Sequence, residues 1–147
     1  MTPQERIEIL HGTELFANAS AEALKLLASH AVERHLHRGE ILFVAGETAR
    51  GLYVAISGAL RAYRENEDGR EQTIRVERAG GTFAEVPVFD NGAYPSTVIA
   101  EEESVVLFLA KEDVRYVLLQ NPEAALAALG VLASRLRKMA TLLERVS

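Results

Sequence analysis

The segment from Gly80 to Ala100, GGTFAEVPVFDNGAYPSTVIA, decides the fold and the candidate site of this 147-residue chain. A Gly pair and Ala84 lead into Glu85, and small residues let a ligand approach the backbone closely. Free amides at the start of a short helical turn attract anions, and an acid beside them is suited to accept hydroxyl donors. The segment therefore predicts a site that holds a phosphate on backbone amides and a sugar on Glu85.

Short strand-forming runs flank this segment on both sides. Gly turns separate the runs that precede it, and the runs cover residues 41–44, 52–56, 60–63, 72–77, 98–100 and 105–109. This pattern predicts an all-β meander, sandwich or roll. In the run 72–77, Thr73 and Arg75 alternate with Ile74 and Val76, which predicts a half-buried strand after a tight hairpin at Asp68-Gly69.

Helical patterns stand at both ends of the chain. Thr2-Pro3 and Ser20 are capping signals for two short helices, and a third is expected over residues 111–120. A last helix is expected over residues 122–146, with a heptad seam of Ala125, Leu129, Leu132, Leu136, Met139, Leu143 and Val146. We interpret this seam as a homodimer interface. The alternative is a helix that packs only on its own domain.

Composition restricts the classes of function. Hydrophobic residues make up 48% and charged residues 25%, which is ordinary for a globular domain, and the net charge of −5 disfavours non-specific binding to nucleic acid. The absence of cysteine excludes disulfides, thiolate catalysis and cysteine-ligated iron–sulfur clusters. Apolar runs of membrane-spanning length and a signal-peptide pattern are both missing from the sequence, so we expect a cytoplasmic protein without a membrane partner.

From about Leu15 to Val146, the sequence resembles the effector-binding half of CRP/FNR transcription regulators. The resemblance is carried by Arg38-Gly39-Glu40, Gly46-Glu47, residues 52–58, residues 68–71 and the segment 80–100. It implies a β-roll, or double-stranded jelly-roll, with short flanking helices over residues 1–120, and a long dimerisation helix over residues 121–147. It also implies that DNA is read by a helix-turn-helix domain after this helix, so we expect the chain to be a piece of a longer regulator.

The members that bind cyclic nucleotides carry a Gly-Glu pair and, ten residues after the Glu, an Arg followed by Ser or Thr and then Ala. The matching residues here are Ala84 and Glu85, then Pro95, Ser96 and Thr97. The resemblance implies a pocket of Ala84, Glu85, Ser96 and Thr97, in which Glu85 accepts from a ribose hydroxyl. Pro95 replaces the Arg that neutralises the phosphate, a loss of about 1.5–3 kcal/mol. We therefore expect a site that is not a standard cAMP site, or a Glu85 that binds backbone amides or an Arg locally.

Other sites find weaker support in the sequence. Met139 and Ala140 stand where the long helix of such regulators reaches the purine, and both are apolar. His35 and His37 would share a strand face suited to a metal, but no third ligand follows at suitable spacing, so we expect no metal. A His or Met139 would be the axial ligand of a haem, which is a less favoured cofactor than a cyclic nucleotide.

Three classes of function stay open. The first is the effector-sensing and dimerisation half of a CRP/FNR-like regulator. The second is a stand-alone cyclic-nucleotide-binding module that signals through a protein partner. The third is a cupin-like enzyme, which would require a metal; the sequence has no P-loop, nucleophile elbow or zinc-protease motif, so we expect no enzyme.

Overall fold

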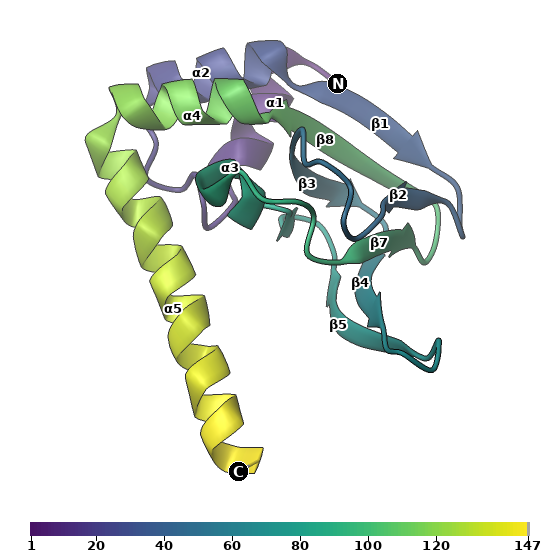
Figure 1. Cartoon of the computed structure of the whole chain (residues 1–147). Helices are drawn as coiled ribbons and strands as arrows, with labels where there is room; N and C mark the ends of the chain where they lie inside the picture. Colours follow the sequence, from purple (N-terminus) through teal and green to yellow (C-terminus); the bar gives the residue numbers. More distant parts are fainter. Residues whose placement is uncertain (147) are drawn as a thin grey trace.

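The computed structural model of the chain describes residues 1–146 (Figure 1). Its elements in chain order are α1 (Pro3–His11), α2 (Ala21–His30), β1 (Val32–Leu36), β2 (Ile41–Phe43), β3 (Gly51–Ser57), β4 (Leu60–Glu65), β5 (Glu71–Glu77), β6 (Thr82–Phe83), α3 (Val86–Asp90), β7 (Thr97–Ala100), β8 (Ser104–Ala110), α4 (Lys111–Gln120) and α5 (Pro122–Val146). The Thr2 and Ser20 side chains accept hydrogen bonds from the amides of Glu5 and Ala23, both at 3.1 Å. These caps confirm the two short helices predicted at the N-terminus.

The strands form two four-stranded antiparallel sheets within the described residues. Their orders are β1-β8-β3-β6 and β2-β7-β4-β5, so consecutive strands lie in different sheets, except for β4 and β5, which pair within one sheet. This winding is that of a jelly-roll, and it confirms the predicted β-roll. The hairpin between β4 and β5 also forms where it was predicted, with Gly69 at a φ of 78°.

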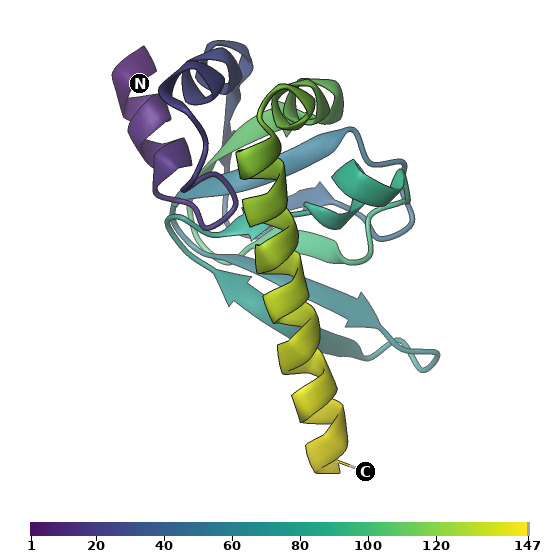
Figure 2. The same ribbon diagram turned by 90° about the vertical axis from the view of Figure 1, so that its left-hand side faces the viewer.

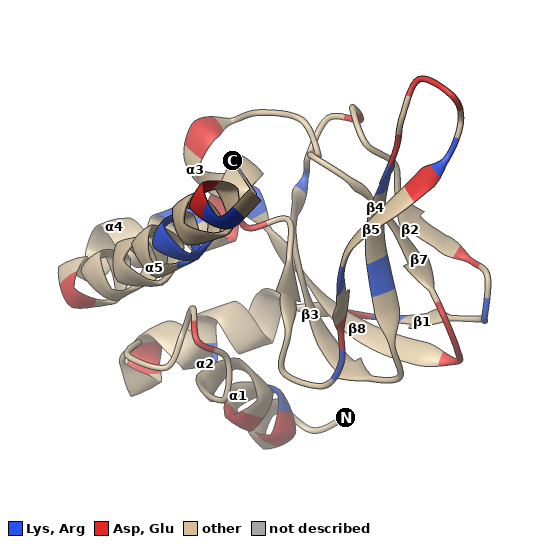
Figure 3. Cartoon of the chain, turned by 90° about the horizontal axis from the view of Figure 1, so that it is seen from below, with Lys and Arg blue, Asp and Glu red and all other residues tan. Residues whose placement is uncertain are grey.

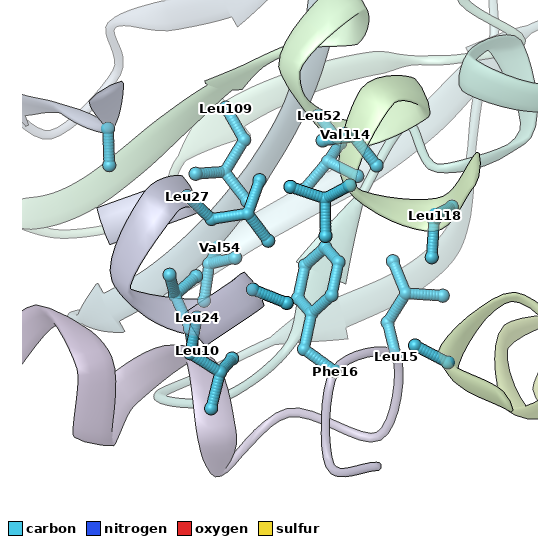
Figure 4. Close-up of a cluster of buried hydrophobic side chains, with 14 of the residues drawn as sticks. Leu10, Leu15, Phe16, Leu24, Leu27, Leu52, Val54, Leu109, Val114 and Leu118 are labelled. Atoms are coloured by element: carbon cyan, nitrogen blue, oxygen red, sulfur yellow. The ribbon is translucent and has the colours of Figure 1, made fainter. Parts of the chain in front are cut away.

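Strand β3 is buried on both faces because it lies between two hydrophobic cores. Leu52 and Val54 face the helices, where they pack with Phe16 and Leu27 (Figure 4). Tyr53 and Ala55 face the other sheet and pack with the interior of the roll. The alternation of side chains along a strand produces this division. One core thus attaches α1, α2 and α4 to the roll, and the other fills the roll itself.

Strand β5 departs from the sequence prediction. Ile74 and Val76 were expected to be the buried side of a half-buried strand, yet they are 54% and 48% exposed. The prediction was wrong because β5 is the edge strand of its sheet and both side chains lie on its exposed face. Arg75, which lies between these two residues in β5, is less exposed than either of them. Its side chain points to the opposite side, into the roll.

The last two helices meet at a bend of 117°. Asn121 stabilises it, since its side-chain amide donates to the Val117 carbonyl oxygen at 2.9 Å and its oxygen accepts from the Ser20 hydroxyl at 3.0 Å. Among the helices of residues 1–146, none is by itself long and apolar enough to cross a membrane. Helices α4 and α5 reach that length and composition only when they are counted together across the bend.

Helix α5 runs from this bend past the roll, and its C-terminal end extends beyond the sheets (Figures 1 and 2). Ala124 and Ala128 are buried against the rest of the domain. The seam residues are instead exposed at Leu129, Leu136, Met139, Leu143 and Val146, and Leu132 is half-buried. This side of α5 is therefore not covered by its own domain, and its role as a homodimer interface stays a prediction. Ser147, the last residue of the range 121–147, lies outside the described residues.

Candidate functional site

The backbone of the segment 80–100, called the cassette below, turns sharply between β6 and α3. Strand β6 pairs with β3 through Phe83 and Tyr53, and the next residue, Ala84, has a φ of 64°. This left-handed conformation favours glycine, because a Cβ atom crowds the following carbonyl oxygen. Glu85 then precedes the first turn of α3 in right-handed helical conformation. The reversal at Ala84 is what directs the Glu85 side chain into the roll.

Replacing Ala84 with valine should lower the free energy of unfolding by about 2 kcal/mol, because a β-branched residue is strained at positive φ. Ala84→Gly should be tolerated. The matched control is Ala93→Val, since Ala93 lies in the same segment, is exposed and has an ordinary φ. Urea unfolding of the three variants measures the effect. Equal losses for Ala84→Val and Ala93→Val would contradict the left-handed conformation.

Glu85 is the most deeply placed acid of the cassette, at 3% exposure. Its Oε1 atom accepts a hydrogen bond from the Arg135 guanidinium of α5, and the Nη2 atom of Arg75 lies 3.7 Å from the same oxygen. Its Oε2 atom is buried without a hydrogen-bond partner among residues 1–146. A carboxylate held by one oxygen leaves the other free to accept a donor from a ligand.

Two guanidinium groups converge on this carboxylate from different elements. Arg75 is fixed in the roll, since it donates to the Thr82 carbonyl oxygen at 3.0 Å and lies 5.3 Å from the centre of the Phe83 ring. Burial lowers the pKa of Arg75, and burial together with the charge of Arg75 lowers the pKa of Arg135. Both groups still carry their charge at neutral pH. Glu77 also lies 3.7 Å from Arg75, so two carboxylates face the two guanidinium groups.

Three of the four predicted pocket residues meet in one cavity. Ala84, Glu85 and Ser96 line it together with Pro95 and Arg75, and its volume is about 50 Å³. The fourth, Thr97, does not line this cavity, because its hydroxyl accepts a hydrogen bond from the Ala45 amide at 3.0 Å. Sites for small molecules usually measure about 300–1,000 Å³. In this conformation the cavity is too small for a nucleotide, and ligand entry requires the surrounding side chains to move.

The sequence did not single out Arg135, although a signal for it existed. Ala124, Ala128, Val131 and Arg135 recur at helical spacing on the side of α5 that is buried or half-buried. Arg135 is thus a cation in line with an apolar stripe that faces the domain. Arg75 was named only as one of the alternating residues of the predicted strand 72–77, and the alternation of β5 places it on the face opposite Ile74 and Val76.

The histidines near the first strand are engaged with carboxylates. His35 lies 2.8 Å from Glu33, and His37 lies 3.0 Å from Glu103, which raises the pKa of His37 through hydrogen bonding and charge attraction. In the part of the chain that the structure describes, no group of three His, Cys, Asp or Glu side chains is placed to hold a metal ion. The cassette therefore stays the strongest candidate site.

Comparison with known proteins places this fold and cassette in a family. Residues 33–121 match the cyclic nucleotide-binding domain. The chain is 29% identical over 129 residues to the cyclic AMP receptor protein of Thermus thermophilus, which covers 88% of this chain and 60% of that protein. It is also 29% identical over 131 residues to the CRP-like cAMP-activated global transcriptional regulator of Mycobacterium tuberculosis, with 89% and 58% covered. The chain thus spans about 60% of the length of these curated relatives.

A solved structure agrees with these relatives. The sensor domain of the transcriptional regulator DNR from Pseudomonas aeruginosa superposes with a TM-score of 0.85 at 28% identity, and the match covers 95% of this chain and 93% of that one. The matched family covers well over half of the 147 residues. From its fold, its cassette and these relatives, the chain belongs to the cyclic nucleotide-binding domain family and groups with its CRP/FNR members.

Proposed function

We propose that this chain is the effector-sensing and dimerisation part of a CRP/FNR-like transcription regulator. The observation that carries the proposal is the contact between Glu85 in the cassette and Arg135 on α5. Because one residue lines the pocket and the other lies on the helix that bears the exposed seam, the two regions share an ion pair. A ligand that competes for Glu85 would change the force that holds α5 against the roll.

The effector that fits this site carries both an anionic group and a hydroxyl donor. The free Oε2 atom of Glu85 suits the hydroxyl, and the guanidinium groups of Arg75 and Arg135 suit the anion. Because the cavity is small, binding selects a conformation in which Arg135 has moved from Glu85. Effector binding would then act as a population shift between two positions of α5.

A standard cAMP site is not what these residues favour. Pro95 lines the cavity where the cAMP-binding relatives are expected to carry an Arg, and proline provides neither a charge nor a backbone N–H. Arg75 and Arg135 are already engaged with Glu85, so neutralising a phosphate means breaking existing contacts. We therefore infer that cAMP binds this chain weakly and that the native effector is a different small anion with hydroxyl groups.

The exposed seam of α5 supports a homodimer. Helix α5 also carries the basic residues Arg135, Arg137, Lys138 and Arg145, and Figure 3 shows Lys and Arg gathered along it. With Glu123 and Glu144, the helix has a net charge of +2, which is too small to bind DNA alone. DNA would instead be read by a helix-turn-helix domain attached to α5.

The regulator names of the relatives support a binding role for this chain rather than a catalytic one, and they support a cytoplasmic location.

The test uses cAMP as the probe. It also uses the variant Pro95→Arg, which restores a cation at the position where the cAMP-binding relatives are expected to carry an Arg. Pro95→Arg should bind cAMP at least about tenfold more tightly than the original chain, since one charge-assisted hydrogen bond is regained. The chain has no cysteine, so Ser134→Cys gives a single site for a spin label on α5. In the labelled Pro95→Arg dimer, cAMP should shift the distance between the two labels. Pro95→Gln is the matched control without the charge.

Two results would contradict the proposal. If Pro95→Arg binds cAMP tightly while the distance between labels stays constant, the pocket is not coupled to α5. If Pro95→Arg fails to bind cAMP at millimolar concentration, the cassette is not a nucleotide scaffold. Adding Glu85→Gln to Pro95→Arg should remove both the binding and the distance shift, which assigns the effect to the cassette.

A further inference from the structure

A second cavity opens in the roll, and it shares the lining residue Phe43 with the small cavity at Glu85. It lies among β1, β2, the loop that joins β2 to β3, and β8, and its volume is about 410 Å³. This volume falls within the range of small-molecule sites. Helix α5 contributes none of its lining residues, and Figure 1 shows α5 leaving the roll on the side away from β1 and β2. The cavity therefore lies apart from the exposed seam of α5.

The inner wall of this cavity is aromatic. The rings of Phe43 and Tyr94 stack with their centres 4.0 Å apart, and those of Tyr53 and Phe108 lie 5.2 Å apart in a tilted arrangement. All four side chains line the cavity, and the first three are less than a tenth exposed. Aromatic rings pack favourably against another ring in stacked or tilted geometry. This wall suits a flat aromatic ligand of about one ring.

The mouth of the cavity is positively charged. Arg34 and Arg50 line it, against one carboxylate, Glu47. Arg34 has a loose ion pair with Glu40 at 3.7 Å, and the Arg50 guanidinium has no hydrogen bond or ion pair within residues 1–146. Burial raises the pKa of Tyr53, so its hydroxyl keeps its proton and is able to donate. The polar groups at the mouth thus include donors that match one carboxylate.

We propose that this cavity binds a small aromatic carboxylate, with its ring on the wall formed by Phe43 and Tyr53 and its carboxylate between Arg34 and Arg50. This cavity is distinct from the small cavity at Glu85 but adjacent to it. Phe43 lines both cavities, and Tyr94, which stacks on Phe43, is the cassette residue directly before Pro95 and Ser96. An occupant that fixes the rings of Phe43 and Tyr94 would also fix one wall of the cassette.

Benzoate is the probe that tests this site, with benzamide as its neutral counterpart. Titration followed by amide chemical shifts should give a saturable response confined to the residues around Phe43, Tyr53 and Tyr94. The double variant Arg34→Gln/Arg50→Gln should weaken benzoate binding at least about tenfold. Arg38→Gln is the matched control, because Arg38 is exposed on the turn after β1 and does not line the cavity.

The proposal is supported if benzoate binds more tightly than benzamide, the double variant weakens it and Arg38→Gln does not. It is overturned if the shifts stay linear up to high millimolar benzoate, or if they spread over unrelated surfaces. It is also overturned if benzamide binds as well as benzoate, or if the double variant binds like the original chain. None of these outcomes depends on cAMP, Pro95 or α5, so this test stands apart from that of the proposed function.

Discussion

The Arg135→Ala variant is expected to lose about 3 kcal/mol of unfolding free energy. Arg135 provides the hydrogen bond to Glu85, whose side chain is only 4% exposed. Removing one partner of a buried ion pair leaves the other charge uncompensated, which costs about 3–5 kcal/mol. We place this variant at the low end because Arg75 remains 3.7 Å from the carboxylate.

Urea unfolding at neutral pH measures this effect. Alanine is the best helix former, so the substitution does not weaken α5 itself. Arg137→Ala is the matched control, since Arg137 is an exposed cation on the same helix, and it should change the unfolding free energy by less than about 0.5 kcal/mol. Similar losses for Arg135→Ala and Arg137→Ala would show that the contact with Glu85 contributes little.

The Leu136→Glu variant should break the proposed homodimer. Leu136 lies in the middle of the seam and is 67% exposed in the single chain. Burying one leucine is worth about 1.5–3 kcal/mol, and a symmetric dimer loses two of them. Two facing glutamates would add repulsion between like charges. We expect the dimer dissociation constant to rise at least about a hundredfold.

Sedimentation equilibrium of the original chain and of the Leu136→Glu variant measures the two dimer dissociation constants. Ser134→Glu is the control, because Ser134 is exposed on α5 two positions before Leu136 and lies off the seam. It introduces the same charge and should leave the dimer intact. A Leu136→Glu chain that sediments as a dimer would assign the interface to another surface. So would equal dissociation of both variants, because the charge rather than the seam would then be responsible.

The architecture was accessible from the sequence because its signals are local. Positive φ at Gly39, Gly46, Gly58 and Gly69 fixes turns between short apolar runs, and Thr2 caps the first helix as predicted. Strand β6 was missed because its two residues are too few to show a period. The exposure of β5 was misjudged because edge position depends on strand order, which alternation along one strand does not reveal.

The candidate site was accessible only in part. The small residue at Ala84 and the acid at Glu85 follow from the cassette sequence, and they lie together with Ser96 as expected. Arg135 lies 50 residues from Glu85, and their contact depends on the bend that returns α5 beside the roll. Local patterns do not encode such a distant pairing. Thr97 lies outside the small cavity at Glu85, and its hydroxyl accepts a hydrogen bond from the Ala45 amide, a long-range contact that the local sequence does not reveal.

The most direct test of the account is a double-mutant cycle between Glu85 and Arg135. Glu85→Gln, Arg135→Gln and the double variant are unfolded in urea beside the original chain. We predict that the double variant loses less unfolding free energy than the two single variants lose in sum. The difference, which is the coupling energy, should be about 1–3 kcal/mol. Additive losses within about 0.5 kcal/mol would contradict the central claim, because the cassette and α5 would then be independent.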